Sequence, residues 1–255
     1  MEPTAADRTY HEVLGVDPST ATTPFAMAAH EFVFGEVWSR PGLSRRDRRW
    51  VTLTCVAAAD APEPMDQHVY GALASGDIDL DEMLEFVLQF AVYCGWPKAS
   101  RLEGAILSQW ARLQSALGKE LVPRPPLSND ALGPNDWDVR MAQGEQEFYE
   151  VNLIHAPPAT TPYLHAGIVN FVFGHVWQRP GLSRRDRRVM TVACVALDDA
   201  PTPLQSHVTA ALHSGDITKA EMDEIVLQFS VYYGFAKGQA LAEVVESAWA
   251  ARPVH

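Results

Sequence analysis

Cysteine is scarce in this chain of 255 residues, which contains only Cys55, Cys94 and Cys194. No two of them form a CxxC pair and no HExxH is present, so the sequence predicts neither a metal site nor a redox dithiol. Cys55 and Cys194 lie in apolar, helix-like segments, where we expect small, buried core residues. The sequence also lacks GxGxxG, Walker A and GxSxG motifs, so neither a phosphate-binding glycine loop nor a nucleophile elbow is indicated.

Positive charge and long apolar runs are also lacking. The 20 Lys and Arg residues are outnumbered by 32 Asp and Glu residues, which gives a net charge of −12. This balance argues against general binding to nucleic acid or to an anionic membrane. No apolar run approaches the roughly 20 residues of a membrane-spanning helix, and the start, MEPTAADRTY, lacks the apolar core of a signal peptide. We therefore expect a soluble, cytoplasmic protein.

What the sequence does contain is a duplicated segment. Residues 32–49 read FVFGEVWSRPGLSRRDRR, and residues 171–188 read FVFGHVWQRPGLSRRDRR. The match runs without a gap from 32–98 to 171–237, with 43 identities in 67 positions. The spacing of 139 residues is too long for a solenoid repeat, whose unit is roughly 20–50 residues. The repeat predicts two copies of one domain, packed around a pseudo-twofold axis.

Helical periodicity dominates both copies, and no convincing alternating strand is present. Residues 80–92 carry an apolar stripe at helical spacing, and Ser44 and Asp79 are suited to N-cap the helices that follow them. We expect helices at about 25–38, 44–59, 64–75, 80–94 and 97–117, and again at about 138–150, 163–177, 183–197, 203–214, 219–233 and 236–250. The predicted fold class is all-α, as tandem duplicated helical bundles.

Proline marks the division between the copies. The segment VPRPPLSNDALGPN at residues 122–135 is typical of an extended linker. We predict a first domain at 1–118, a linker at 119–137 and a second domain at 138–255. Residues 1–9 are expected to be frayed.

Two histidines occupy equivalent positions. His68 and His207 each follow an Asp-Ala-Pro-x-Pro segment and lie about one turn into a helix. An imidazole titrates near neutrality and can donate or accept a proton, so both are candidate acid–base groups. The alternative is a partly buried structural histidine. A metal site is not predicted, because no second histidine lies at i+4.

The sharpest difference between the copies is Glu36, which His175 replaces in the second copy. Both are close in sequence to a tryptophan, Trp38 or Trp177. If Glu36 and His68 share a site, the second copy pairs His175 with His207, and the two sites differ in charge. The alternative is an exposed helix position that is free to drift.

Arginines gather after each tryptophan. Arg40 and Arg179 precede Pro-Gly, and the runs 45–49 and 184–188 place positive charge in first helical turns, against the helix dipole. Salt bridges would offset this cost for most of them. Arg40 and Arg179 are the better candidates for an anion pocket, because arginine binds a carboxylate in a bidentate fork. The aromatic residues of both copies are interpreted mainly as core: Trp38, Trp177, Phe34, Phe173, Tyr93 and Tyr232.

The segments FGEVWSRPGLSRRDRRWVTLTCVAAA and HVYGALASGDIDLDEMLEFVLQFAVYCGWPKA resemble the carboxymuconolactone decarboxylase family. The resemblance covers about residues 25–113 and 163–250. It is closer to the decarboxylase branch than to the alkylhydroperoxidase D branch, whose CxxC positions hold Ala61 and Pro64 here, and Ala200 and Pro203 in the second copy. The glutamate of that branch falls on Arg49 and Arg188, so the resemblance implies no dithiol chemistry.

The resemblance implies a cofactor-independent decarboxylase of a small carboxylated lactone such as 4-carboxymuconolactone, with the substrate as its own electron sink. It implies all-α units that form a homotrimer, giving a pseudo-hexamer. Alternatives are a related lyase or isomerase, a decarboxylase of a polycyclic or aromatic acid in a biosynthetic pathway, and a non-catalytic duplicated scaffold.

The resemblance also suggests roles for the candidate residues. Arg40 would anchor a substrate carboxylate, and His68 would donate to the oxyanion or transfer the proton. Glu36 would orient His68 or relay the proton, and Trp38 would keep the pocket dry. In the second copy the same set is Arg179, His207, His175 and Trp177.

Overall fold

The computed structural model describes residues 2–198 and 200–252. Regular structure in these ranges is entirely helical, which confirms the predicted all-α class. None of the described helices is both long and apolar enough to cross a membrane. Met1 and residues 253–255, at the outer ends of the two predicted domains, lie outside the described ranges.

The first copy contains the helices α1 (Ala5–Leu14), α2 (Pro24–Ala28), η1 (Ala29–Val37), α3 (Arg45–Ala58), α4 (Pro62–Ser75), α5 (Leu80–Cys94) and α6 (Trp96–Ala116). After the short η2 (Asn129–Leu132), the second copy contains α7 (Trp137–Asn152), η3 (Tyr163–Phe173), η4 (Val176–Gln178), α8 (Arg184–Leu197), α9 (Pro201–His213), α10 (Lys219–Tyr233) and α11 (Phe235–Ala250).

The first helix begins earlier than predicted. Residues 1–9 were expected to be frayed, but α1 starts at Ala5 behind a reciprocal cap. The Thr4 side chain accepts a 3.1 Å bond from the Asp7 amide, and the Asp7 carboxylate accepts a 2.7 Å bond from the Thr4 amide. This capping box satisfies two amides that a helix start otherwise leaves unpaired, and it stabilises a first turn that lacks apolar periodicity.

Other helix starts follow the sequence directly. Ser44 accepts a 3.1 Å bond from the Asp47 amide at the start of α3, and Asp79 accepts a 2.8 Å bond from the Glu82 amide at the start of α5. Both N-caps were predicted from residue type and position.

The helix before each tryptophan is a π-helix. The expected helices at 25–38 and 163–177 correspond mainly to η1 and η3, and in η1 the Trp38 amide bonds the Val33 carbonyl five residues back, at 2.9 Å. In the second copy the π-helix ends at Phe173, and the 3₁₀ turn η4 carries Trp177. Wider turns of this kind are concentrated at functional sites.

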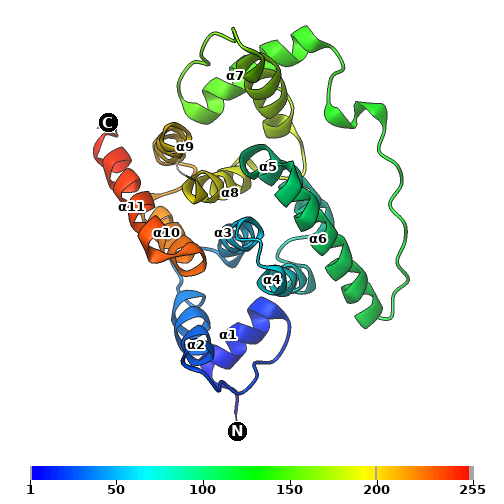
Figure 1. Cartoon of the computed structure of the whole chain (residues 1–255), viewed down its shortest axis with the longest axis vertical. Coiled ribbons are helices and arrows are strands. Elements are labelled where there is room, and N and C mark those ends of the chain that lie inside the picture. Colours follow the sequence, from blue (N-terminus) through cyan, green and yellow to red (C-terminus); the bar gives the residue numbers. More distant parts are fainter. Residues whose placement is uncertain (1, 199, 253–255) are drawn as a thin grey trace.

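The two copies pack around one continuous core. The equivalent helices α3 and α8 lie side by side at its centre, α5 packs on α8, and α10 packs on α3 (Figure 1). The buried core residues come from both copies without a gap between them. Each copy therefore lends its long helix, α5 or α10, to cover the central helix of the other.

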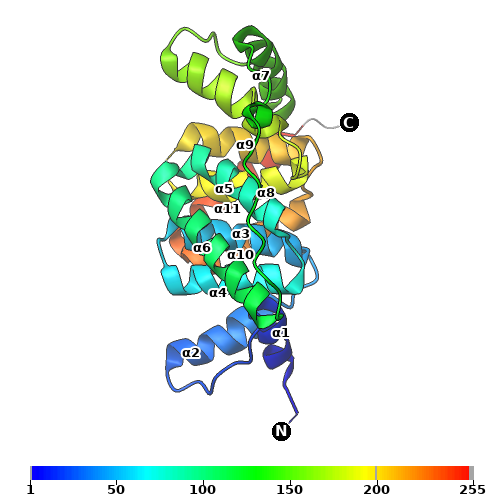
Figure 2. The same cartoon turned by 90° about the vertical axis from the view of Figure 1, so that its right-hand side faces the viewer.

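The linker follows the outside of the molecule. Residues 119–128 have no regular secondary structure, and they run along the molecule's length from α6 to η2 and α7 (Figure 2). Arg124 pairs with Asp81 of α5 at 2.6 Å. The boundaries at 118 and 138 stay a prediction, since the shared core crosses them.

Ion pairs between the copies compensate the positive charge in the arginine-rich first turns of α3 and α8. Arg46 donates to Asp186 at 2.9 Å, and Arg185 donates to Asp47 at 2.9 Å. Both aspartates are buried, at 6% and 4% exposure. The pairs are not identical, because the Trp50 indole also donates to Asp186 at 2.8 Å, whereas the equivalent of Trp50 is a valine.

We predict that Asp186→Ala destabilises the protein more than its matched control, Asp47→Ala. Breaking a buried ion pair costs about 3–5 kcal/mol. Only Asp186→Ala also leaves the buried Trp50 N–H without its acceptor, which adds about 1–3 kcal/mol. Denaturant unfolding measures both values, and equal losses would contradict the prediction.

Candidate active site

Two parallel rings form the centre of the site in the first copy. The His68 imidazole on α4 lies over the Trp38 indole, with ring centroids 6.0 Å and planes 13° apart. Tyr232, on α10 of the second copy, meets the imidazole edge-on at 5.1 Å and accepts a 2.7 Å hydrogen bond from the Trp38 indole. The predicted catalytic histidine of one copy therefore shares its site with a side chain of the other.

The second copy repeats this arrangement. The His207 and Trp177 ring centroids are 6.1 Å apart, with planes 4° apart, and Tyr93 of the first copy meets the imidazole edge-on at 5.5 Å. The Trp177 indole donates to the Tyr93 hydroxyl at 2.9 Å. The same hydroxyl lies 3.4 Å from Nε2 of His207.

Local sequence explains why each histidine points inward. α4 begins at Pro62, which suits the first turn of a helix because it has no amide to leave unpaired. From there Met65, His68, Val69 and Ala72 follow at helical spacing and are all buried. His68 thus belongs to the apolar face of its own helix, and the same holds for His207 on α9.

Both imidazoles are neutral. His68 is 5% exposed and His207 is 6% exposed. Burial lowers the pKa of each to about 3, and a nearby arginine, Arg49 or Arg188, lowers it further. A neutral imidazole can donate one N–H bond to a developing oxyanion, but it cannot supply a proton as an imidazolium at neutral pH.

The cations nearest these histidines are Arg49 and Arg188, which were not among the predicted site residues. The Arg49 guanidinium lies over the Trp38 ring at 6.0 Å and is held by Asp77 at 2.7 Å and by the Val13 carbonyl at 2.9 Å. Arg188 is held in the same way by Asp216 and by the carbonyl of Val151. Each site therefore has a buried, fixed positive charge behind its rings.

Arg40 and Arg179 bind carboxylates of the opposite copy. Arg40 donates through Nε and Nη2 to Glu224, at 2.8 Å and 2.6 Å. Arg179 binds Glu85 in the same bidentate way and also donates to the carbonyl of Ala131 in the linker. The Arg40 side chain is 50% exposed and that of Arg179 is 19% exposed. The linker therefore shields Arg179 and leaves Arg40 open to solvent.

The residues at the divergent position face different environments. Glu36 is exposed, and the described residues show no hydrogen bond between it and His68. His175 is only 3% exposed, and its Nε2 is buried without a partner. Burial, together with Arg179, lowers the pKa of His175 to about 4. The structure thus brings together Trp38 and His68, and Trp177 and His207, whereas the side chain of Glu36 is exposed.

A comparison with known protein families identifies both copies. The family model for carboxymuconolactone decarboxylases matches residues 24–107 and again 162–247, two thirds of the chain. The chain belongs to the carboxymuconolactone decarboxylase family. It carries two copies of the family domain, as the resemblance implied.

Two curated decarboxylases are similar to parts of this carboxymuconolactone decarboxylase family chain. The nitrosuccinic acid decarboxylase of Metarhizium robertsii is 38% identical over 91 residues, covering 34% of this chain and 62% of that protein. The 4-carboxymuconolactone decarboxylase of Acinetobacter baylyi is 34% identical over 79 residues, covering 31% of this chain and 58% of that protein. The matched regions thus span about three fifths of each relative.

Sequence reasoning missed the role of the tyrosines in this family member. Tyr93 and Tyr232 were interpreted as core, but their rings meet the imidazoles of the opposite copies edge-on, and the Tyr93 hydroxyl lies 3.4 Å from His207. Burial raises the pKa of both phenols, so each hydroxyl keeps its proton. The available signal in the sequence was that both copies carry a tyrosine at this position. Its role becomes clear only from the packing of α5 and α10 against the opposite copy.

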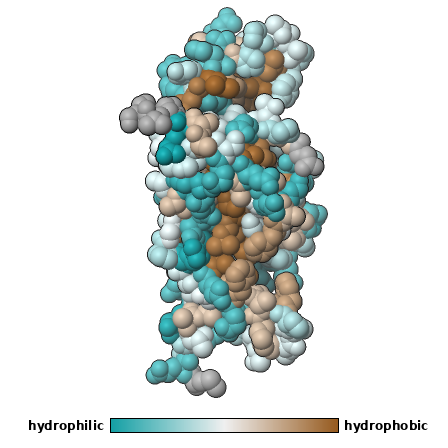
Figure 3. Space-filling model, turned by 90° about the vertical axis from the view of Figure 1, so that its left-hand side faces the viewer, coloured by the Kyte–Doolittle hydropathy of each residue, from teal (hydrophilic) through white to brown (hydrophobic). Residues whose placement is uncertain are grey.

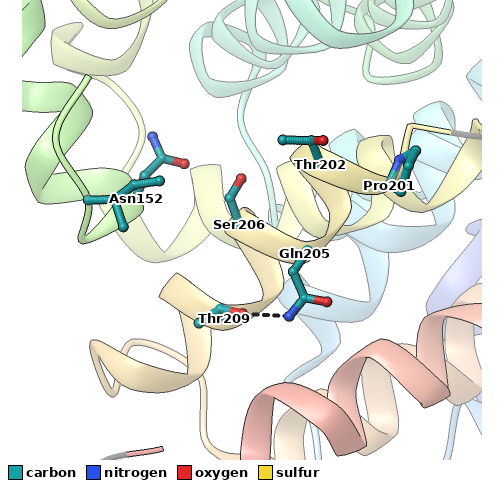
Figure 4. Close-up of a pocket in the computed structure, with 7 residues that line it drawn as sticks. Asn152, Pro201, Thr202, Gln205, Ser206 and Thr209 are labelled. Atoms are coloured by element: carbon teal, nitrogen blue, oxygen red, sulfur yellow. Dashed lines mark hydrogen bonds between the residues drawn. The ribbon is translucent and has the colours of Figure 1, made fainter. Parts of the chain in front are cut away.

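A cavity lies on the outer face of α9, beside the C-terminal end of α7 (Figure 4). Its volume is about 530 Å³. The lining contains no charged side chain: Asn152, Ile154, Pro201, Thr202, Gln205, Ser206 and Thr209. None of the predicted site residues lines it, although His207 follows Ser206 in the same helix. In the first copy, Tyr70 occupies the position of Thr209 and carries Arg112 over its ring at 4.2 Å.

We predict that the buried histidines make this carboxymuconolactone decarboxylase family protein less stable in acid. In the folded protein His68 and His207 stay neutral down to about pH 3, whereas in the unfolded chain they bind protons below about pH 6.5. The unfolded state therefore binds more protons between these values, and the free energy of unfolding falls as the pH decreases, by up to about 1.4 kcal/mol per pH unit for each histidine.

Denaturant unfolding at about pH 7 and about pH 5 measures this slope. The double variant His68→Asn/His207→Asn should show a smaller loss between the two conditions than the wild type, whatever its absolute stability. Equal losses would show that these histidines do not titrate differently on unfolding.

Proposed function

We propose that this protein is a cofactor-independent decarboxylase of a small acid whose own substituent delocalises the resulting carbanion. The carboxylated lactone 4-carboxymuconolactone is the leading candidate substrate, and nitrosuccinic acid is the second. A conjugated lactone carbonyl and a nitro group can both accept the electron pair that the departing CO₂ leaves behind. The C–C bond to the carboxylate breaks, the pair moves onto oxygen, and a proton then adds to carbon.

The observation that best supports this proposal is the neutral imidazole stacked on tryptophan in front of a buried arginine. His68 can donate one N–H to the oxyanion, and the fixed charge of Arg49 stabilises the same negative charge in a site with little water. Trp38 provides the dry wall. His207, Arg188 and Trp177 would act alike in the second copy.

The proposed carboxylate anchors differ between the copies. Within residues 2–198 and 200–252, the hydrogen bonds of Arg40 use Nε and Nη2, which leaves Nη1 for a substrate carboxylate. The Nη1 group of Arg179 already donates to the Ala131 carbonyl. We therefore assign substrate capture to the first copy, with exposed Glu36 as the group that relays a proton from solvent. His175, neutral and buried, would not replace it.

A non-catalytic scaffold is the second candidate. Its support is the depth of His68 and His207, because neither lines the described cavity on α9. If the protein is a decarboxylase, the side chains around each imidazole must therefore move to admit the substrate.

We predict that His68→Ala lowers the rate of decarboxylation by about 10²–10³-fold, because it removes a hydrogen-bond donor to the oxyanion. Glu36→Gln lowers it by slowing proton delivery, and His207→Ala has a smaller effect because Arg179 is already occupied. The measurement is the absorbance of 4-carboxymuconolactone on mixing with the protein, with CO₂ release as the control, followed by the same assay with nitrosuccinic acid.

Wild-type rates in both histidine variants would remove the assignment of these residues. Binding of either acid without turnover would favour the scaffold. Turnover of an aromatic or polycyclic acid alone would favour a different substrate on the same site.

We also propose that the chain assembles as a homotrimer in the cytoplasm. Large apolar side chains at equivalent helix starts are exposed, Trp96 at 60% and Phe235 at 62%, and apolar surface forms a stripe along one face of the molecule (Figure 3). Such patches are typical of association surfaces. The three cysteines are unpaired, as expected in a reducing compartment.

A solution mass of three times the 28.1 kDa of one chain is expected. The double variant Trp96→Glu/Phe235→Glu should shift the mass towards that of one chain, because the charges would be buried without partners. Light scattering measures both, and a wild-type mass of one chain would exclude the trimer.

A further inference from the structure

We propose that a chain of hydrogen-bond donors running from Arg187 to Tyr93 fixes the tautomer of His207, so that the imidazole proton resides on Nδ1. This makes Gln89, in the middle of the chain, a positioning residue of the site. The inference deepens the proposed function, and it rests on that function only for its consequence in catalysis.

The chain starts at a group that can only donate. Nη1 of buried Arg187 lies 2.9 Å from Oε1 of Gln89. A guanidinium has no acceptor, so the carbonyl oxygen of the Gln89 amide must face it. The amide nitrogen then points the other way, and Nε2 donates to the Thr191 hydroxyl at 3.0 Å.

Thr191 continues the chain to the Tyr93 phenol with the same donor-to-acceptor direction. Its oxygen accepts from Gln89, which leaves its own proton to donate. Burial raises the pKa of the Tyr93 phenol, and hydrogen bonding from Trp177 and Thr191 opposes that rise, which puts the Thr191 hydroxyl within reach of the phenol oxygen. The Trp177 indole, another group that can only donate, lies 2.9 Å from the same oxygen. The phenol oxygen therefore accepts twice.

The phenol's own proton has one remaining direction. Nε2 of His207 lies 3.4 Å from the Tyr93 oxygen, a long bond between groups whose donors and acceptors are complementary only if the tyrosine donates. Nε2 is then the acceptor nitrogen. The imidazole is neutral and carries one proton, which must be on Nδ1. Bonds aligned in one sense strengthen one another.

The donor chain passes repeatedly between the copies. Arg187, Thr191 and His207 belong to the second copy, whereas Gln89 and Tyr93 belong to the first. The first site repeats the chain as far as the phenol: Arg48 to Gln228 at 3.1 Å, Gln228 to Thr52 at 2.9 Å, and Trp38 to Tyr232 at 2.7 Å. The tautomer of His207 is thus set by residues of both copies, with Gln89 and Tyr93 supplied by the first.

Changing one atom of Gln89 should reverse the chain. In Gln89→Glu the side chain keeps its shape and still accepts from Arg187, but it has no N–H for Thr191. The threonine proton then turns towards the carboxylate, and its oxygen becomes an acceptor for the tyrosine. His207 loses its donor at Nε2, and the proton can move there.

Nuclear magnetic resonance of protein carrying ¹⁵N,¹³C-labelled histidine measures the tautomer directly, because the two ring nitrogens have different shifts in each form. The wild type should show His207 with its proton on Nδ1. Gln89→Glu should move the His207 proton to Nε2 and leave the His68 signals unchanged, because the chain that starts at Arg48 is intact. Gln228→Glu is the matched control, and it should leave His207 unchanged.

Tyr93→Phe removes the last donor, together with the oxygen that accepts from Trp177, and should move the His207 proton in the same way, so it keeps the test available if Gln89→Glu does not fold. A wild-type His207 protonated on Nε2, or an Nδ1 proton that persists in either variant, would overturn the proposal. The readout requires no substrate, so its failure is distinct from failure of the decarboxylase proposal. If turnover is present, Gln89→Glu should lower kcat more than it changes KM.

Discussion

The pairing of α5 with α8, and of α10 with α3, is the interaction on which the site depends. α5 presents Glu85, Gln89 and Tyr93 at intervals of four residues, so the three side chains lie on one face of the helix. Facing them on α8 are Arg187 and Thr191, also four residues apart. The side chains of the two rows alternate. Arg187 forms an ion pair with Glu85 and donates a hydrogen bond to the Gln89 carbonyl oxygen. Gln89 donates to the Thr191 hydroxyl, and Tyr93 ends the row at the His207 ring.

Burial makes this polar ladder a strict constraint on register. Arg48 and Arg187 are each 1% exposed, and an uncompensated charge at that depth costs several kcal/mol. A shift of one helix along the other would leave the guanidinium, the amide and the hydroxyl without partners together. The ladder therefore aligns the two copies more specifically than the apolar core around it, which tolerates many packings.

The same ladder explains what the sequence could and could not predict. Residues such as Ser44 and Asp79 act on amides three positions away, so helix starts and the repeat follow from local pattern. In α5, however, the apolar stripe of residues 80–92 indicates one buried face and leaves Glu85 and Gln89 on an apparently solvated one. That face is covered by a helix nearly 100 residues later, and no spacing within α5 reports this.

For the same reason the ion pairs of Arg40 and Arg179 were not foreseen. Both arginines were predicted to anchor a substrate carboxylate, and in the structure they bind Glu224 and Glu85 of the opposite copy. The charge of Arg49 beside His68 was missed because its sequence position is one turn into an arginine-rich helix that resembles a solvated end. Its burial follows from α1 and the Asp77 loop closing over it.

Fusing the copies into one chain makes unequal sites possible. In a symmetric dimer every change appears at both sites. Here the interior residues of the two ladders are the same, and each ladder draws on both copies, so a loss on either side would disable it. Differences collect at the outer positions: exposed Glu36 against buried His175, and open Arg40 against Arg179 capped by the linker. Because each site depends on both copies, the ladder residues stay the same in the two copies. The outer residues of each site belong to one copy and are free to diverge.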